Sequence, residues 1–343
     1  MQRNLSTIGS TVALVIAVAS CGSNDPEQSN DARGTKGNYP RDSTLRMNQL
    51  QTKGTHNSFH IEPAGTGIVP WQYTHLPLDQ QLLEQGVRAV ELDINYEATA
   101  QHFEVFHVPT LDQETTCRLF VDCLSALESF SLKNPAHHPI FIQIEPKTPF
   151  PTDAVEAYLE RFESEILSVF ARERIVTPDD VRGDSPTLRE AVTGKGWPTL
   201  GETRGKVLFF LNETADFRNA YTRQGQNLDG RLMFVESDPS DPFAGVLIIN
   251  DPLPTIEPAV RDGFIVRTRA DSDGVEPRAG DTSRREAAIA SGAQIVSTDF
   301  PAPVTGLDYW VEIPDGQPSR CNPFSAPAEC ASTDIENPRF IWH

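Results

Sequence analysis

The sequence has little positive charge. It holds 29 lysines and arginines against 48 aspartates and glutamates, which gives a formal net charge of -19. Such a protein repels nucleic acid and anionic membrane surfaces, so neither is a good electrostatic partner. An acidic protein can instead bind cations, and a bound metal ion would offset the repulsion between neighbouring carboxylates.

The sequence also lacks a hydrophobic run long enough to cross a membrane as a stable helix. The apolar stretch at 11–20, TVALVIAVAS, follows Arg3 and ends in small residues. This pattern predicts a secretory signal, and Cys21 directly after it resembles the lipid-modified cysteine of a bacterial lipoprotein. An ordinary signal peptide with an incidental cysteine is the alternative.

The predicted signal divides the chain into three parts. We expect a lipoprotein-type signal peptide over 1–20 and a flexible, polar tether over 21–44. One folded domain then covers 45–343 and ends in a proline-rich tail. The protein is expected to be a monomer that is exported, either lipid-anchored at the cell envelope or secreted.

Beyond Cys21, cysteine is scarce. The four others are Cys117, Cys123, Cys321 and Cys330. An even number in an exported chain predicts disulfides. Sequence alone leaves three pairings open, of which the two local pairs would close small loops. A zinc site is the alternative, but neither local pair has the two-residue spacing usual for zinc.

Apolar runs of strand length recur along the chain and alternate with helical patterns. Helical patterns lie at 77–87, 153–175 and 283–293. This alternation predicts an α/β fold with a parallel sheet, and eight strands suggest a TIM-like (β/α)8 barrel, distorted in its later units. A doubly wound sheet is the alternative. The eight expected strands lie at 47–54, 88–95, 139–146, 206–213, 231–237, 245–251, 263–269 and 293–299.

Carboxylates lie on one face of the second and third expected strands. Glu91 and Asp93 are two residues apart and share a face, and Glu145 lies near the end of the next strand, followed by Lys147. Both faces of a barrel strand are covered, so these charges need a positive partner. With the amide oxygen of Asn57, they form a ligand set suited to Ca²⁺ or Mg²⁺.

Two histidines complete the pattern. His56 follows the first strand beside Asn57, where it can face bound substrate, and His107 lies in a short hairpin or extended segment after the second strand. Alone, His102 or His107 would be an ordinary surface histidine, but His107 becomes a candidate site residue together with His56 and the carboxylates. His60, near the first of them, is expected to be a loop residue without a catalytic role.

These pieces, in this order, resemble the catalytic part of calcium-dependent phosphoinositide-specific phospholipase C in its single-domain bacterial form. The resemblance covers about residues 45–330. The pieces that carry it are GTHNSFH, GVRAVELDIN, VFHVPT, HHPIFIQIEPK, TPDDVRG, GWPTLGETRGKVLFFL, GFIVRTRAD and SGAQIVSTDFP.

The resemblance implies a phosphodiesterase acting on phosphoinositides or related phospholipids, reached at the membrane interface. It implies that His56 and His107 carry the acid–base chemistry. It also implies that calcium, with magnesium as the alternative, is bound by Asn57, Glu91, Asp93 and Glu145.

Three cations are candidates for substrate binding. Lys147 is placed for the phosphate because it neighbours Glu145. Arg267 and Arg269 share one face near the end of the seventh strand, where they could bind lipid phosphate or inositol phosphates. Salt bridges to the acidic loops are an equally good interpretation of the two arginines.

Other functions on the same barrel remain open from the sequence. A glycerophosphodiester phosphodiesterase or a sphingomyelinase-D-like enzyme would share the histidines and carboxylates. The glycerophosphodiesterases usually have Arg-Gly after the first histidine, whereas this chain has Asn57-Ser58. A non-catalytic, metal-binding surface lipoprotein is a third alternative, disfavoured because every expected catalytic residue and ligand is present.

Overall fold

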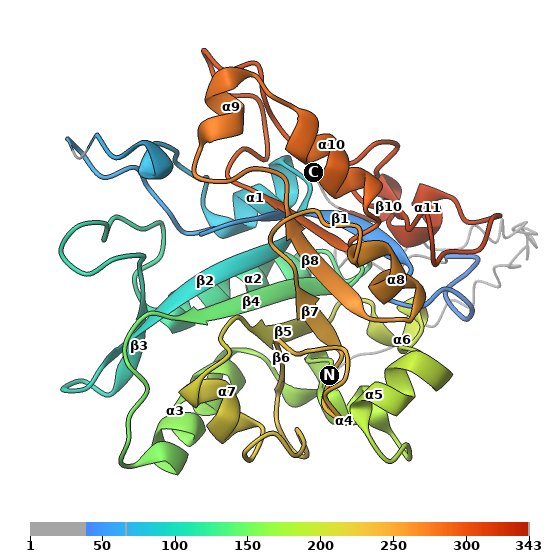
Figure 1. Cartoon of the computed structure of the whole chain (residues 1–343), viewed down its shortest axis with the longest axis horizontal. Helices are drawn as coiled ribbons and strands as arrows, with labels where there is room; N and C mark the ends of the chain where they lie inside the picture. Colours follow the sequence, from blue (N-terminus) through green and yellow to red (C-terminus); the bar gives the residue numbers. More distant parts are fainter. Residues whose placement is uncertain (1–38, 66, 342–343) are drawn as a thin grey trace, which may run out of the picture. The chain divides into compact units, whose positions relative to one another are not determined.

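Eight parallel strands of the described chain form a nearly closed barrel (Figure 1). Their order around it is β6-β5-β4-β2-β1-β9-β8-β7, and β6 meets β7 through the bridge between Glu236 and Val246. The arrangement confirms the TIM-like barrel and rules out the doubly wound sheet. The strands are β1 Leu50–Thr55, β2 Val87–Glu97, β4 Ile140–Pro146, β5 Val207–Leu211, β6 Met233–Val235, β7 Val246–Ile248, β8 Ile265–Arg269 and β9 Ile295–Thr298.

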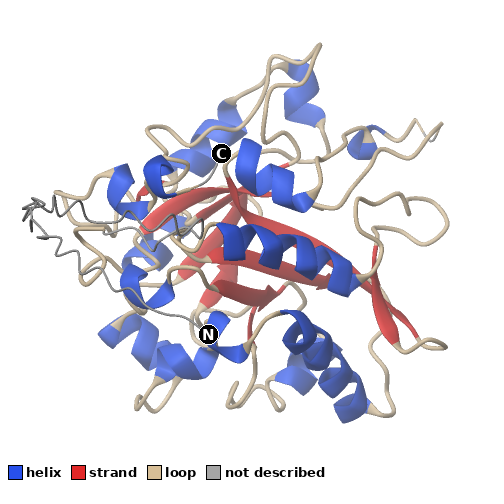
Figure 2. Ribbon diagram, turned by 180° about the vertical axis from the view of Figure 1, so that it is seen from behind, coloured by secondary structure: helices blue, strands red, loops and turns tan. Residues whose placement is uncertain are grey.

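Helices surround the strands (Figure 2). The three helical patterns expected from sequence are found as α1 Leu78–Glu84, α3 Val155–Val169 and α10 Ser283–Ala290. The other helices are α2 Phe120–Lys133, α4 Pro178–Arg182, α5 Leu188–Glu190, α6 Leu200–Thr203, α7 Asp216–Tyr221, α8 Ile256–Arg261, α9 Val275–Ala279 and α11 Ser332–Ile335. Single turns occur at η1 Val69–Trp71, η2 Arg172–Arg174, η3 Ala191–Lys195 and η4 Pro338–Phe340.

This computed structural model describes residues 39–65 and 67–341, which belong to the compact unit Arg33–His343. The expected signal peptide, Cys21 and most of the tether lie outside the described residues. No helix within the described ranges is both long and apolar enough to cross a membrane.

The apolar runs form strands because both of their faces are covered. Every residue of β1, β5 and β9 is buried. Outward-facing side chains pack under the helices: Phe103, Phe120 and Phe162, for example, contact one another where β3, α2 and α3 meet.

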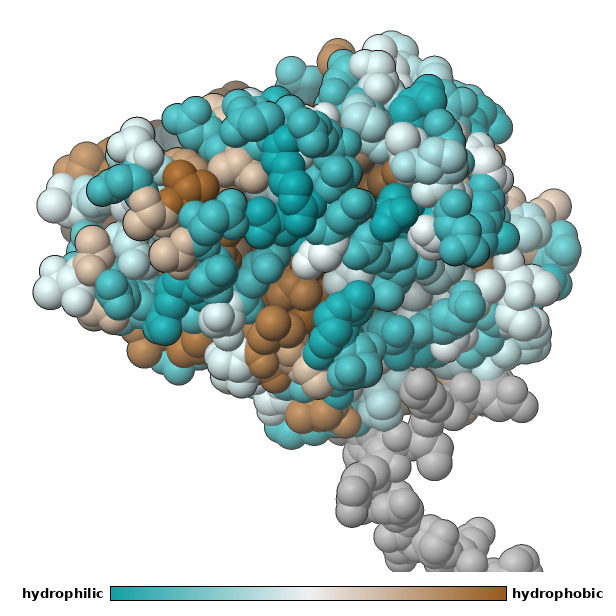
Figure 3. Space-filling view, turned by 90° about the horizontal axis from the view of Figure 1, so that it is seen from below, coloured by the Kyte–Doolittle hydropathy of each residue, from teal (hydrophilic) through white to brown (hydrophobic). Residues whose placement is uncertain are grey.

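The face in Figure 3 is largely hydrophilic, with hydrophobic residues in smaller patches.

Two short strands extend the barrel at opposite ends. β3 (His102–Val105) pairs antiparallel with the end of β2, which confirms the expected hairpin. β10 (Arg320–Cys321) pairs antiparallel with the start of β1. The hairpin therefore lies at the end where the parallel strands finish, and the C-terminal segment lies at the end where they begin.

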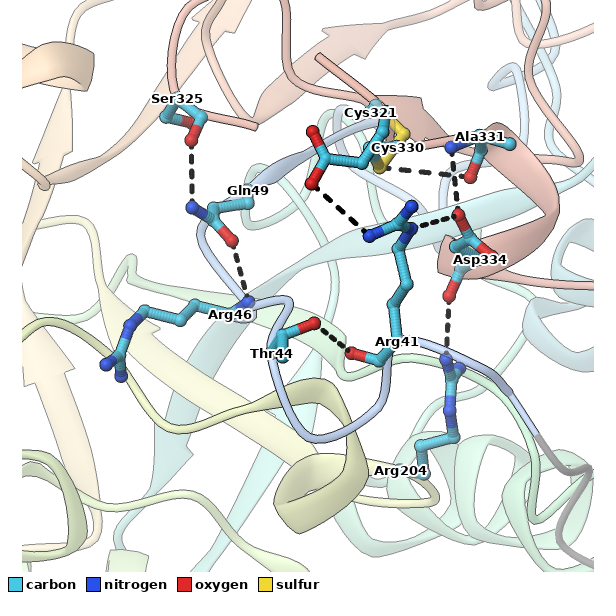
Figure 4. The surroundings of a disulfide bond; sticks show 11 residues. Arg41, Thr44, Arg46, Gln49, Arg204, Cys321, Ser325, Cys330, Ala331 and Asp334 are labelled. Carbon is cyan, nitrogen blue, oxygen red and sulfur yellow. Dashed lines mark hydrogen bonds and ion pairs between the residues drawn. A yellow bond between two sulfur atoms is a disulfide. The ribbon is translucent and has the colours of Figure 1, made fainter. Parts of the chain in front are cut away.

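The C-terminal segment, residues 313–341, is closed on itself by the Cys321–Cys330 disulfide and is fixed to the rest of the chain by polar contacts (Figure 4). Cys321 and Cys330 are joined, as are Cys117 and Cys123, so the two local pairings are the ones formed. In Figure 4, Gln49 donates to the carbonyl of Ser325 at 2.8 Å, and Arg41 Nε lies 3.2 Å from the Asp334 carboxylate.

Candidate active site

The chain turns sharply where β1 ends. Asn57 adopts a left-handed backbone conformation with φ of 42°, which asparagine tolerates better than most residues. The turn is held by the amide of His56, which donates to Thr298, and by that of Ser58, which donates to Glu91, both at 3.0 Å. Neighbouring residues on a strand point in opposite directions, so this turn is what allows His56 and Asn57 to serve one site.

Three carboxylates gather beside this turn. One oxygen each from Glu91, Asp93 and Glu145 lies within 4.8 Å of the others. Strand register brings them together, because β2 and β4 are parallel and Asp93 is directly paired with Glu145. Among the described residues, the buried atoms Asn57 Oδ1 and Asp93 Oδ1 have no hydrogen-bond partner. These are the donors expected for a hard cation, and their unpaired oxygens fit one.

Burial changes the pKa values of the three clustered carboxylates. Burial raises the pKa of Glu91 to about 7 against the opposing effect of Arg267, and raises that of Asp93 well above its usual value. Glu145 differs: burial opposes its ionisation, but Lys147 lowers its pKa overall. Ionising all three carboxylates together therefore requires more positive charge than the neighbouring side chains provide.

His56 is oriented by a carboxylate. Its Nδ1 lies 2.7 Å from Oδ1 of Asp299, the residue directly after β9. Burial opposes ionisation of Asp299, but His56 and Arg269 lower its pKa to about 2. An ionised carboxylate only accepts hydrogen bonds, so Nδ1 carries the proton and Nε2 keeps its lone pair. Burial and Arg269 also lower the pKa of His56 to about 3, which favours the neutral base.

His107 is oriented in the same way by a different carboxylate. Its Nδ1 lies 2.8 Å from Oδ2 of Asp112, which is fully buried. The backbone brings His107 to the metal cluster, because the preceding amide, that of Phe106, donates to the carbonyl of Asp93. Both catalytic candidates keep about a fifth of the side chain exposed, so substrate can reach them.

The three predicted substrate-binding cations all reach the site and are ion-paired there. Lys147 contacts Glu145 and lies 3.1 Å from Asp93. Arg267 Nη2 lies 2.9 Å from Glu91. Arg269 Nη2 lies 3.3 Å from Asp299, and its Nη1 lies 3.4 Å from His56 Nε2. Each cation therefore balances a candidate ligand or catalytic group.

Sequence reasoning missed several residues that line this site. Asp299 follows the last strand at its carboxyl end, so the rule that selected the other residues would have found it. Asn212 also follows a strand, β5, and donates to Glu145 at 2.6 Å. Asp112 and His60 lie in loops, where no strand pattern marks them. His60 is a loop residue, as expected, but it is buried and hydrogen-bonded to Asp112 at 3.0 Å.

The arrangement combines two acid–base groups with a site for a divalent cation. His56 presents a neutral nitrogen, His107 presents a second ring nitrogen, and the three carboxylates lie close together on β2 and β4. Such a set can take a proton from one hydroxyl and give a proton to a leaving oxygen while developing negative charge is stabilised. These are the requirements for cleaving a phosphodiester.

Comparisons with solved structures agree with the barrel. The chain is similar to calcium-dependent phosphoinositol-specific phospholipase C from the Gram-negative bacterium Pseudomonas sp in its apo form, with 19% identity over 82% of this chain and 97% of that one, and a TM-score of 0.58. The myoinositol complex of the same enzyme matches with 18% identity, the same coverage and a TM-score of 0.59. A Ca²⁺-dependent phosphatidylinositol-specific phospholipase C from Streptomyces antibioticus matches with 19% identity over 75% and 95%, and a TM-score of 0.57.

Sequence comparison identifies the family. No curated protein sequence matches the chain. The family model for phosphoinositide phospholipase C, Ca²⁺-dependent, matches residues 95–323, which is more than half of the chain. The match includes His107 and Glu145 and begins after Asp93. The chain therefore belongs to the calcium-dependent phosphoinositide phospholipase C family, whose members are phosphoric diester hydrolases.

Proposed function

We propose that the protein is a calcium-dependent phosphodiesterase that cleaves phosphoinositides or closely related phospholipids at the headgroup. The observation that carries the proposal is the cluster of three carboxylates beside the turn at Asn57, together with two histidines, each oriented by its own carboxylate. Diacylglycerol is the lipid product, and the headgroup leaves as a cyclic phosphate that water then opens.

Calcium would be held by Asn57, Glu91, Asp93 and Glu145. The buried oxygens of Asn57 and Asp93 that lack hydrogen bonds within the described ranges support this assignment, since a bound cation would satisfy them. When bound, the ion supplies positive charge for the phosphoryl oxygens and lowers the pKa of a coordinated hydroxyl. Magnesium is the alternative, disfavoured by the family match.

The two histidines divide the proton transfers. His56 accepts the proton of the attacking inositol hydroxyl at Nε2, because Asp299 holds the ring in that tautomer. His107 donates its proton to the glycerol oxygen as the phosphorus–oxygen bond breaks. Their roles reverse when water opens the cyclic phosphate. Arg269, beside His56, is placed to contact the phosphate.

Substrate is reached from a membrane surface outside the cytoplasm. Apolar residues lie beside His107: the Trp71 ring lies against its ring, and the exposed Val69 is two residues before Trp71. Arg278 donates to the carbonyl of Val69, which holds the segment of the exposed Val275 beside it. Export is supported by the sequence pattern at 1–20 and by two disulfides in the described ranges. Attachment through a lipid on Cys21 would keep the enzyme at the envelope.

The proposal is tested with the purified protein and phosphatidylinositol vesicles. We expect hydrolysis that needs Ca²⁺ and stops when a chelator is added. His56→Ala and His107→Ala should each lower kcat by about 10²–10⁴-fold, the usual contribution of a general acid or base. Phosphorus NMR should detect a cyclic inositol phosphate before the open product.

The controls separate the chemistry from the fold. Each variant should keep the circular dichroism spectrum and melting temperature of the parent. Activity that survives chelation would contradict the metal assignment. A product formed without any cyclic phosphate would favour direct attack by water, as in a glycerophosphodiesterase. A panel of phospholipids with other headgroups then identifies the preferred substrate.

A further inference from the structure

We propose that Asp112, supported by His60, is a positioning residue that sets the orientation and protonation of His107. The inference rests on the proposed function, because it assumes that His107 donates a proton to the leaving oxygen. Asp112 has no contact with the carboxylates of the metal cluster among the interactions described, so it acts through His107.

One carboxylate oxygen serves both imidazoles. Oδ2 of Asp112 lies 2.8 Å from His107 Nδ1 and 3.0 Å from His60 Nε2. Burial opposes ionisation of Asp112, but these two hydrogen bonds lower its pKa overall. An ionised carboxylate fixes the proton of His107 on Nδ1 and stabilises the charged ring formed when Nε2 also holds a proton. Nε2 then carries the proton that is transferred.

The loop that carries Asp112 is built to hold it still. Asp112 and Val108 exchange two backbone hydrogen bonds of 2.9 Å, which closes a tight loop directly after His107. Thr110 within this loop has φ of 66°, an uncommon backbone conformation that the closure imposes. The next residues pair with the active-site turn through the bridge between His60 and Thr115.

His60 fixes the carboxylate from the other side. Its Nδ1 lies 3.0 Å from the carbonyl oxygen of Tyr73, and its ring lies against the Tyr73 ring with centroids 4.4 Å apart. Both ring nitrogens are therefore engaged, and the side chain is fully buried. A buried histidine held at both nitrogens cannot reach substrate, so its effect must pass through Asp112.

The test compares two inositol phosphodiesters in the full-length enzyme. Phosphatidylinositol has a poor alkoxide leaving group that needs a proton, whereas a nitrophenyl ester of inositol phosphate does not. We expect Asp112→Asn to lower kcat on phosphatidylinositol about 100-fold, as for other residues that orient a catalytic group, with little change in KM. The loss on the nitrophenyl ester should be less than about tenfold.

Two further variants complete the design. His60→Phe keeps the ring packing on Tyr73 but removes the hydrogen bond to Asp112, so it should show the same pattern with a smaller loss. Glu104→Gln is the matched control, because Glu104 also pairs with a histidine, His102, at 3.6 Å, but in β3. It should leave both activities unchanged.

The outcomes distinguish the two proposals. A selective loss on phosphatidylinositol, with an unchanged melting temperature, supports the positioning role. An equal loss on both esters, or no loss on either, overturns it while the parent enzyme remains active. A parent enzyme that cleaves neither ester contradicts the proposed function instead.

Discussion

At the scale of single residues, Lys147 places a positive charge directly beside the proposed metal site. Its ammonium group contacts Glu145 and lies 3.1 Å from Asp93, so it neighbours two of the carboxylates assigned to calcium. The neighbouring carboxylates raise its pKa despite burial, which keeps it charged at any physiological pH. A cation bound by the same carboxylates therefore experiences its repulsion.

Lys147→Met should consequently bind Ca²⁺ more tightly. Removing a positive charge a few ångströms from the ion should strengthen binding by roughly tenfold, even with solvent screening. Activity should fall, because a cation beside the phosphate site is lost. Isothermal calorimetry measures the affinity, and Lys133→Met, at the exposed end of α2, controls for net charge. Weaker binding in Lys147→Met would show that the lysine supports the metal site.

The sequence predicted the site carboxylates that lie within strands β2 and β4. Glu91, Asp93 and Glu145 could be grouped because side chains alternate along a strand and parallel strands end together. Asp112 and His60 could not, since their meeting depends on a loop closed by Val108 and on a turn after β1. Loop geometry is set by many weak contacts that no periodic pattern records.

At the scale of elements, the C-terminal segment closes the end of the barrel opposite the site. Arg88, at the start of β2, is buried with Glu336, and its Nε lies 3.0 Å from both carboxylate oxygens. Arg88 also donates to the carbonyls of Leu82 and Val87. Contacts at this end of a barrel contribute stability rather than catalysis.

Glu336→Gln should therefore destabilise the protein without changing the chemistry. It leaves the buried guanidinium of Arg88 without its counter-charge, which typically costs about 3–5 kcal/mol. Urea unfolding measures the loss, and kcat at low temperature should match the parent. Glu257→Gln breaks the exposed pair with Arg261, 2.9 Å apart, and should cost less than about 1 kcal/mol. Equal losses would contradict the assignment.

The strands were the most predictable elements. Each of the eight expected runs overlaps a barrel strand, because burial on both faces requires continuous apolar sequence. Their ends differ by a few residues: the run expected at 245–251 forms only Val246–Ile248. α2 was not expected. The pairing of β10 with β1 could not be predicted, since a two-residue strand has no pattern of its own.

At the scale of the whole molecule, some exposed apolar residues lie on the side of the candidate site and others lie far from it. Val69 and Val275 are 44% and 63% exposed and lie on segments joined by Arg278, and Val69 is two residues from Trp71, which contacts His107. Leu132 is 58% exposed near the end of α2, which leads to the opposite end of the barrel. The net charge of -19 opposes electrostatic attraction to anionic lipid, so apolar contacts must supply the attraction to a membrane.

Val275→Asp should accordingly weaken activity on vesicles but not on a soluble ester. Burying one valine in lipid contributes about 1.5 kcal/mol, which corresponds to roughly a tenfold change in vesicle binding. Vesicle sedimentation measures the binding directly. Leu132→Asp is the matched control and should leave it unchanged. Equal effects of the two changes would place the membrane contact elsewhere.

The position of β1 in the sheet also governs when the enzyme can become active. β1 lies between β2 and β9, and its first residues pair with β10, so its neighbours come from early and late parts of the chain. Asp299, which orients His56, is synthesised more than two hundred residues after it. A chain still emerging from the ribosome therefore holds no working site, and its phosphodiesterase activity can arise only once nearly all of it has been made and has folded.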